Sequence, residues 1–287
     1  MKAILLSVAF LAFATAPLRA QVTVELRLEQ NQFLRNETLP VKMRITNRSG
    51  RPLKIGETSD WLSFTVQDHN GKVVPPVQEV VAGGKFELDS ASSVTKVIDL
   101  SPGYDFSQPG KYRVSAVAQF PDLKLSVSSD PEPFDIIRGA HLWQEVCGVD
   151  TPGGTPHYIR YSLLQAFQLQ QLRIYVRVSD EPEANFARVI PLGGIVSFAK
   201  PEQIIDRSSI LHALYQSGPR SFDYWQITPR GEVAQQKAYD LGSTRPRLKM
   251  SEDGHVEVVG GVPRSAPSVA TGAAADTNGT NLNKRPN

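Results

Sequence analysis

Cysteine is almost absent from this chain, since Cys147 is the single cysteine among 287 residues. An intramolecular disulfide is excluded, because a bridge needs two thiols. A lone cysteine between Val146 and Gly148 is typical of a small buried apolar side chain. The fold must therefore be held together by hydrophobic cores, and the chain is long enough to build them.

Long hydrophobic runs are also missing, apart from one near the start. The apolar run Ala3–Ala16 is shorter than the ~20 residues that a membrane-spanning helix needs. Lys2 precedes it and Ala20 follows it, which is the pattern of a secretory signal peptide. We therefore predict a signal peptide at 1–20, cleavage near Ala20–Gln21 and export to the periplasm or the cell exterior. We predict no transmembrane segment in the mature chain.

The sequence has no excess of charge of one sign. It contains 31 Lys and Arg against 29 Asp and Glu, which gives a formal net charge of +2. Loss of the signal peptide removes Lys2 and Arg19 and leaves 0, and the segment 263–287 holds +2, so residues 21–262 carry −2. A near-neutral body lacks the basic surface that binding to a phosphate backbone requires. Nucleic acid is therefore excluded as a partner.

Common catalytic and metal-binding motifs are absent as well. The sequence has no Gly-x-Ser-x-Gly, His-Glu-x-x-His, Cys-x-x-Cys or phosphate-binding glycine loop. Its five histidines never occur two or four residues apart. His212 lies in an apolar segment, which favours a partly buried strand histidine with a hydrogen-bond partner. We predict no metal and no cofactor, and a protein that is not an enzyme.

What the sequence does contain, over 22–127, is a period-two alternation of apolar and polar residues. The alternation is clear at Val22–Leu28 and Val41–Ile45, and similar segments follow, separated by turn residues such as Asn70-Gly71. Alternation of this kind is typical of strands with one buried face, and Asn-Gly is a strong hairpin signal. About seven short strands in this stretch predict a β-sandwich.

Three segments carry a resemblance to a known kind of domain. They are Leu39–Ser49 (LPVKMRITNRS), Leu62–Val73 (LSFTVQDHNGKV) and Phe106–Ala116 (FSQPGKYRVSA). Together they resemble an immunoglobulin-like sandwich of the bacterial extracytoplasmic kind, which is similar to the intracellular proteinase inhibitor domain family. The resemblance implies an immunoglobulin-like domain at 21–137, in which the Tyr112 hydroxyl bonds back to the preceding corner. It describes a geometry, and no inhibitor activity follows from it alone.

The second half has the same alternation, clearest at Leu172–Val178. Further strand-like segments follow, one of them at Ile195–Ala199, and Gly193-Gly194 has the composition of a turn or bulge. We predict a second all-β domain at 138–262, built as an antiparallel meander. Whether a rigid interface joins the two domains stays open.

Two segments of this half do not show the alternation of strands: residues 158–168 and the end of the chain. Residues 158–168 are open between helix and strand, because Ile159, Leu163 and Phe167 have helical spacing. The segment 263–287 has too few apolar residues to build a core, so we predict a disordered tail there.

Aromatic residues gather within a short part of the second half, with polar residues between them. On a strand, Phe222, Tyr224 and Gln226 share one face, and Asp223, Trp225 and Ile227 share the other. Rings of this kind either fill the two faces of a sheet or form an exposed platform that stacks on a sugar or anchors a protein. The residues of this candidate binding platform are Tyr215, Phe222, Asp223, Tyr224, Trp225 and Tyr239. For the acids Asp206 and Asp223, we expect charge pairing with Arg207, Arg220 or Arg230.

These observations predict an exported, non-catalytic binding or scaffold protein, all-β in fold. Its partner is an unidentified protein or a cell-envelope polysaccharide. One alternative is a carbohydrate- or cell-wall-binding module that uses the aromatic cluster. A further alternative is a protease inhibitor, or a hydrolase in which a pair of carboxylates acts on a glycosidic bond.

Overall fold

The structure is a computed structural model that describes residues 22–149, 157–168, 170–181, 186–196 and 198–264. Over these residues the only helices are two short 3-10 turns, η1 (Ser59–Trp61) and η2 (Pro121–Leu123), and nearly all strand pairs are antiparallel. The predicted all-β class is confirmed. The chain divides into two compact units, Met1–Arg138 and Gly139–Asn287. The predicted signal peptide at 1–20, its cleavage at Ala20–Gln21, and nearly all of the predicted tail at 263–287 lie outside the described residues.

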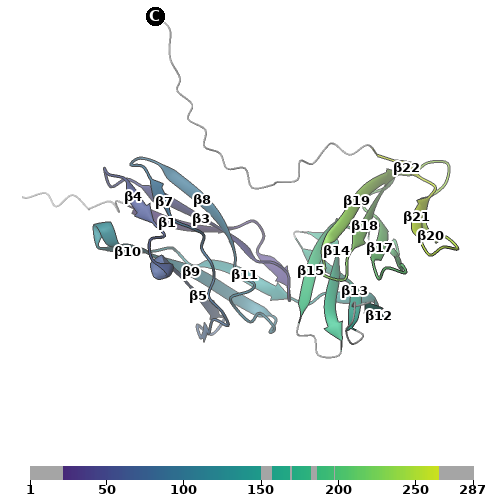
Figure 1. Cartoon of the computed structure of the whole chain (residues 1–287), viewed down its shortest axis with the longest axis horizontal. Coiled ribbons are helices and arrows are strands. Elements are labelled where there is room, and N and C mark those ends of the chain that lie inside the picture. The colour runs from purple at the N-terminus through teal and green to yellow at the C-terminus, as the bar shows by residue number, and fades with distance from the viewer. Residues whose placement is uncertain (1–21, 150–156, 169, 182–185, 197, 265–287) are drawn as a thin grey trace, which may run out of the picture. The chain divides into compact units, whose positions relative to one another are not determined.

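The N-terminal unit contains two main sheets (Figure 1). The first has the order β1-β3-β8, with bounds β1 (Val22–Leu28), β3 (Pro40–Asn47) and β8 (Ser93–Asp99). The second has the order β2-β11-β9-β5-β6, with bounds β2 (Gln32–Leu34), β11 (Glu132–Ile137), β9 (Gly110–Phe120), β5 (Leu62–Asp68) and β6 (Val73–Val74). A strand at β10 (Leu125–Ser128) pairs with β9, and β4 (Leu53–Ile55) pairs with β7 (Phe86–Leu88).

Both sheets contribute to one hydrophobic core. The alternation noted in the sequence places Val41, Met43 and Ile45 of β3 in it, and Val114 and Ala116 of β9 enter it from the other sheet. In the view of Figure 1 the strands of the first sheet lie above those of the second. The two sheets therefore pack face to face, as in a sandwich.

Two local expectations for this unit are met. Asn70-Gly71 closes the hairpin between β5 and β6, where Gly71 has φ +78° and Asp68 N donates to Lys72 O at 2.9 Å. Glycine suits this position because other residues rarely adopt a positive φ. The Tyr112 hydroxyl donates to Gln108 O at 2.7 Å, which ties the start of β9 to the corner before it.

The C-terminal unit is an antiparallel meander in two sheets (Figure 1). The four-stranded sheet runs β12 (Ala140–Val149), β13 (His157–Gln168), β14 (Gln171–Glu181) and β15 (Ala187–Gly194). The five-stranded sheet runs β16 (Glu202–Ile205), β17 (Leu211–Gln216), β18 (Ser221–Ile227), β19 (Val233–Asp240) and β22 (Val262–Pro263). A separate hairpin pairs β20 (Arg247–Met250) with β21 (Val256–Val259).

The five-stranded sheet has apolar side chains on both faces. One face shares a core with the four-stranded sheet, through residues such as Tyr161, Val176 and Ile227. The other face is covered by the β20–β21 hairpin, whose Leu248 and Val258 pack on it. Figure 1 shows this hairpin, in yellow, beside β17.

The helical alternative for 158–168 is wrong, because these residues form β13. Side chains that alternate along this strand are buried on both faces, for example Leu163 on one face and Leu164 on the other. A strand buried on both faces loses its period-two pattern, and its apolar residues then mimic helical spacing.

The predicted strand at Ile195–Ala199 is also wrong, because β15 ends at Gly194. A bulge places Leu192 outside the register with β14, and Gly193 adopts φ +137°. After the bulge the chain crosses between sheets: Ile195 N donates to Leu172 O at 2.9 Å and Val196 N donates to Gln216 O at 3.0 Å. The bulge therefore lies at Leu192, directly before Gly193-Gly194, and the two glycines are paired with β14 as the last residues of β15.

Candidate functional site

The structure brings the predicted aromatic residues onto three neighbouring strands and buries all five rings. Phe222, Tyr224 and Tyr239 lie under the β20–β21 hairpin, while Tyr215 and Trp225 lie in the core between the two sheets of the unit. The two faces of β18 are divided as the alternation predicted, but neither is open to solvent. The exposed platform is therefore wrong, and packing in the cores is the alternative that is observed.

Asp223 stands at the edge of this cluster without the arginine pairing expected for it. Its carboxyl lies close to the hydroxyls of Ser217 and Tyr215 and interacts electrostatically with Arg264. Burial raises the pKa of the Asp223 carboxyl above its ordinary value, and these three partners oppose that shift.

This raised pKa gives a testable pH dependence. The folded chain holds the Asp223 proton to higher pH than the unfolded chain, so the contribution of this group to stability falls as pH rises from 3.8 through the higher folded pKa. Asp223→Asn should remove that fall, whereas Glu252→Gln, at an exposed acid, should keep it. Urea unfolding of the C-terminal unit between about pH 3.5 and 6 measures the difference. Equal pH profiles for the two variants would contradict the assignment.

The other predicted acid, Asp206, pairs with His212 and not with an arginine. His212 Nε2 lies 3.1 Å from Asp206 Oδ2, His212 Nδ1 lies 2.7 Å from the Tyr224 hydroxyl, and Gln226 Nε2 donates to that hydroxyl at 2.8 Å. Asp206 Oδ1 accepts the backbone N–H groups of Ser208 and Ile210. A neutral imidazole with its proton on Nε2 satisfies this chain, since Tyr224 then donates to Nδ1.

The carboxylate–imidazole–hydroxyl order of this network resembles a catalytic relay, but its hydroxyl belongs to a tyrosine inside the fold. His212 is 3% exposed and Tyr224 is likewise buried. Burial raises the pKa of the Tyr224 phenol, so the hydroxyl keeps its proton. The network therefore fixes the loop between β16 and β17 to β18. The sequence drew attention to His212 and Asp206 one at a time. It did not show that the turn between β16 and β17 brings their side chains together.

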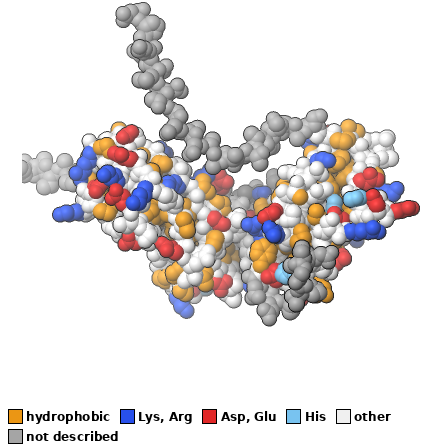
Figure 2. All heavy atoms as spheres, in the orientation of Figure 1, with side chains coloured by type: hydrophobic (Ala, Val, Ile, Leu, Met, Phe, Trp, Pro, Cys, Tyr) orange, Lys and Arg blue, Asp and Glu red, His pale blue; other side chains and the backbone are white. Residues whose placement is uncertain are grey.

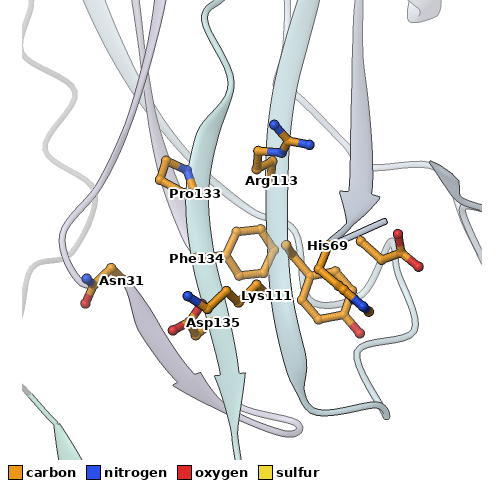
Figure 3. Close-up of a pocket in the computed structure, with 9 residues that line it drawn as sticks. Asn31, His69, Lys111, Arg113, Pro133, Phe134 and Asp135 are labelled. Atoms are coloured by element: carbon orange, nitrogen blue, oxygen red, sulfur yellow. The ribbon is translucent and has the colours of Figure 1, made fainter. Parts of the chain in front are cut away.

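A pocket of about 510 Å³ lies on the N-terminal unit, at strands β5, β9 and β11 of the second sheet (Figure 3). Its size falls within the range of about 300–1,000 Å³ that is usual for ligand sites. It is lined by Asn31, Asp68, His69, Lys111, Tyr112, Arg113, Pro133, Phe134 and Asp135.

Cross-strand pairing between β9 and β11 builds this pocket. Lys111 is opposite Asp135, and Arg113 is opposite Pro133. Tyr112 and Phe134, which lie between them, point into the core and are buried. The outward side chains therefore stand on a rigid ladder.

The loops beside the ladder are also held in place. Asp135 N donates to Asn31 O at 2.7 Å, and Asp68 Oδ1 accepts two backbone N–H groups of its hairpin, both at 2.9 Å. His69 and Asn31 lie at the rim of the pocket in Figure 3.

Charged side chains in this pocket stand without partners. Within the described residues, the side chains of Lys111, Arg113 and Asp135 make no hydrogen bond or ion pair that satisfies their charge. The sequence did not single them out. Their alternation with the buried Tyr112 and Phe134 indicates that these charged side chains face away from the core. It does not show that β9 and β11 become neighbours.

A second pocket, of about 390 Å³, lies in the C-terminal unit. Two of its polar side chains are engaged: His157 Nε2 lies 3.3 Å from Asp180 Oδ1, and the Arg188 guanidinium donates to Gly231 O at 3.5 Å. The pocket of the N-terminal unit is the larger of the two and stands on paired strands, so it is the better candidate for a ligand or partner.

The remaining surface offers no stronger signal. Figure 2 shows acidic and basic side chains interspersed over the described parts of both units in that view. In the described ranges, no three His, Cys, Asp or Glu side chains are grouped so that they could hold a metal ion. None of the described residues lies in a helix long and apolar enough to cross a membrane.

Comparisons with known proteins give no family. No family model matches the sequence, and no curated protein matches it. Among solved structures, the chain is similar to Spo0M, a sporulation control protein from Bacillus subtilis, with a TM-score of 0.32 and 8% identity over 61% of this chain and 91% of that chain. Similarity at that level carries no inference about the fold or activity of this chain.

Proposed function

We propose that the chain is an exported, non-catalytic binding protein whose partner contacts the polar pocket of the N-terminal unit. The observation that carries the proposal is the set of three unpartnered charges, Lys111, Arg113 and Asp135, on adjacent rigid strands. Lys111 and Arg113 are exposed and Asp135 is half-buried, so these charges beside a concave surface are available for charge-assisted hydrogen bonds to a ligand, which are stronger than neutral ones.

Two features support a binding role over catalysis. The catalytic-type arrangement of Asp206, His212 and Tyr224 is enclosed beneath a hairpin and its hydrogen bonds serve the fold. The pocket itself presents charges on strands of one sheet, and the hydroxyl in its lining, that of Tyr112, is engaged with Gln108 O.

The same unit supports the proposal that it is an immunoglobulin-like sandwich. Two sheets share one core, and the Tyr112 hydroxyl returns to the corner before its strand, which is the tyrosine-corner arrangement known from such domains. Domains of this architecture commonly present binding residues on loops that a rigid scaffold positions, and the pocket is lined in part by Asn31 and His69, which lie outside the strands.

A protein partner is favoured over a polysaccharide. The pocket presents both signs of charge, which suits a protein surface that carries an acid and a base close together. A neutral polysaccharide would rely on exposed ring faces, and the five rings considered for that role are buried.

The test is capture of the partner from envelope extract by the purified chain, with a photo-crosslinker at His69 on the rim of the pocket. Lys111→Ser/Arg113→Ser should lower recovery at least tenfold, because losing two charge-assisted contacts costs at least about 1.5 kcal/mol. Arg27→Ser/Lys54→Ser removes the same charge from exposed positions on β1 and β4 and should leave recovery unchanged. Equal recovery with all three proteins would overturn the pocket as the site.

A further inference from the structure

The strand β12 is the outermost strand of the four-stranded sheet of the C-terminal unit. It has 10 residues, and among the described residues it pairs with β13 alone. A strand in this position presents a row of unpaired backbone N–H and C=O groups along its outer side. Such a row is a template for another strand.

The other edge of the same sheet is protected, and β12 is not. The edge strand β15 carries Arg188, Pro191 and the bulge at Leu192, which are devices that prevent strand addition. β12 contains no Lys, Arg or Pro and one acid, Glu145. Its own irregularity, between His141 and Trp143, leaves the rest of the strand in regular register.

Apolar side chains stand exposed next to this open edge. Val146 is 44% exposed and Tyr158 on β13 is 50% exposed. Both lie on the same face, because Tyr158 is opposite Gly148, two residues after Val146. A Cβ at Gly148 would lie 3.7 Å from the Tyr158 ring, so that ring borders the edge of the sheet.

We propose that β12 pairs antiparallel with β12 of a second copy of this chain, with Val146 on the two-fold axis. Residues that share a face then meet: Val146 is opposite Val146 of the second copy, Gln144 is opposite Gly148, and Trp143 is opposite Val149. This register buries Val146 and Tyr158 of both copies around the axis. It also joins the two four-stranded sheets into one continuous sheet.

Charge favours the register centred on Val146 over the register centred on Glu145. Centring the pairing on Glu145 would place two carboxylates directly opposite one another, which is unfavourable. Centring it on Val146 places Glu145 opposite Cys147 and leaves no like charges opposed. The edge is thus complementary to itself, and a two-fold axis is the commonest symmetry of homo-oligomers.

The first test is the mass of the purified chain in solution, by sedimentation equilibrium over a range of concentrations. The wild type is expected to dimerise. Val146→Lys should weaken the dimer at least 100-fold, because it places two ammonium groups together on the axis. Val97→Lys makes the same change at a 62% exposed valine on β8, an edge strand of the other unit, and should leave the dimer intact. Both valines are exposed, so thermal unfolding should be the same in either variant and the wild type at a dilution where the wild type has dissociated to monomers.

A crosslink tests the register itself. In a Cys147→Ser background, Val146→Cys should form a disulfide-linked dimer under mild oxidation, since directly opposed residues of antiparallel strands have Cβ atoms about 4.5–5.5 Å apart. Val97→Cys in the same background should stay uncrosslinked. A wild type that is monomeric at every concentration overturns the proposal, as does a dimer that Val146→Lys leaves intact. Pairing of β12 with an extended segment of a different protein, and not with a second copy, would also overturn it.

Discussion

His212→Ala is expected to lower the free energy of unfolding of the C-terminal unit by about 4 kcal/mol. The substitution removes a buried side chain and leaves a cavity beneath the β20–β21 hairpin. It also leaves the Tyr224 hydroxyl without its acceptor and Asp206 Oδ2 without its donor. Cavity formation and buried unsatisfied polar groups are two of the mechanisms that give the largest losses of stability.

The two units must be followed separately, because one transition cannot be assumed for a two-unit chain. Hydrogen exchange during a urea titration, read on peptides from β17–β18 and from β3, reports each unit by itself. Only the C-terminal peptides should shift.

Two comparisons isolate the network from a general effect of losing a histidine. His69→Ala and His255→Ala remove exposed histidines at turns and should change stability by less than about 0.5 kcal/mol. Tyr224→Phe keeps the ring and removes one partner of the network, so its cost should be about 1–2 kcal/mol. A His212→Ala variant as stable as the two surface variants would show that the network contributes nothing to the fold.

Strand positions could be predicted from the sequence wherever one face of a strand is buried. Val41–Ile45 alternates because β3 has a core side and a solvent side. The pattern left β13 open between helix and strand, because that strand is buried on both faces. It was misleading at Ile195, where the chain leaves β14 and Val196 reaches Gln216 of the other sheet. In both places tertiary surroundings outweigh the local pattern.

The candidate sites were less predictable, because they depend on what covers a surface. The division of β18 into two faces was predicted correctly, but the hairpin that covers Tyr224 comes from residues far along the chain. The pocket is more distant still from any local pattern, since Asn31, Asp68 and Lys111 meet only through the strand order β2-β11-β9-β5. Non-local pairing of this kind leaves no spacing in the sequence to find.

Phe134→Ala should have the largest effect in the N-terminal unit, a loss of about 4 kcal/mol. Phe134 is 1% exposed and its ring lies at the centre of an aromatic cluster. It stacks on Tyr112 at 5.6 Å and makes edge-to-face contacts with Phe106 at 5.6 Å and Phe33 at 6.2 Å. Each such pair contributes beyond the area it buries. Hydrogen exchange on β3 and β9 peptides during urea titration measures the loss. Phe198→Ala, at a 98% exposed ring of the C-terminal unit, is read on β17–β18 peptides and should cost less than about 0.5 kcal/mol.

Phe134 also connects the core with the pocket, because it belongs to the core and lies between two pocket residues on β11. Phe134 lies between Pro133 and Asp135 on β11, so the position of both pocket residues depends on how that ring packs. Phe134→Leu keeps most of the buried volume and should cost less than Phe134→Ala. Under conditions where both variants remain folded, we expect partner capture to fall with Phe134→Ala and to stay close to wild type with Phe134→Leu. Unchanged capture by a folded Phe134→Ala would mean that the ladder tolerates repacking, and that Lys111 and Arg113 on β9 position the partner without support from β11.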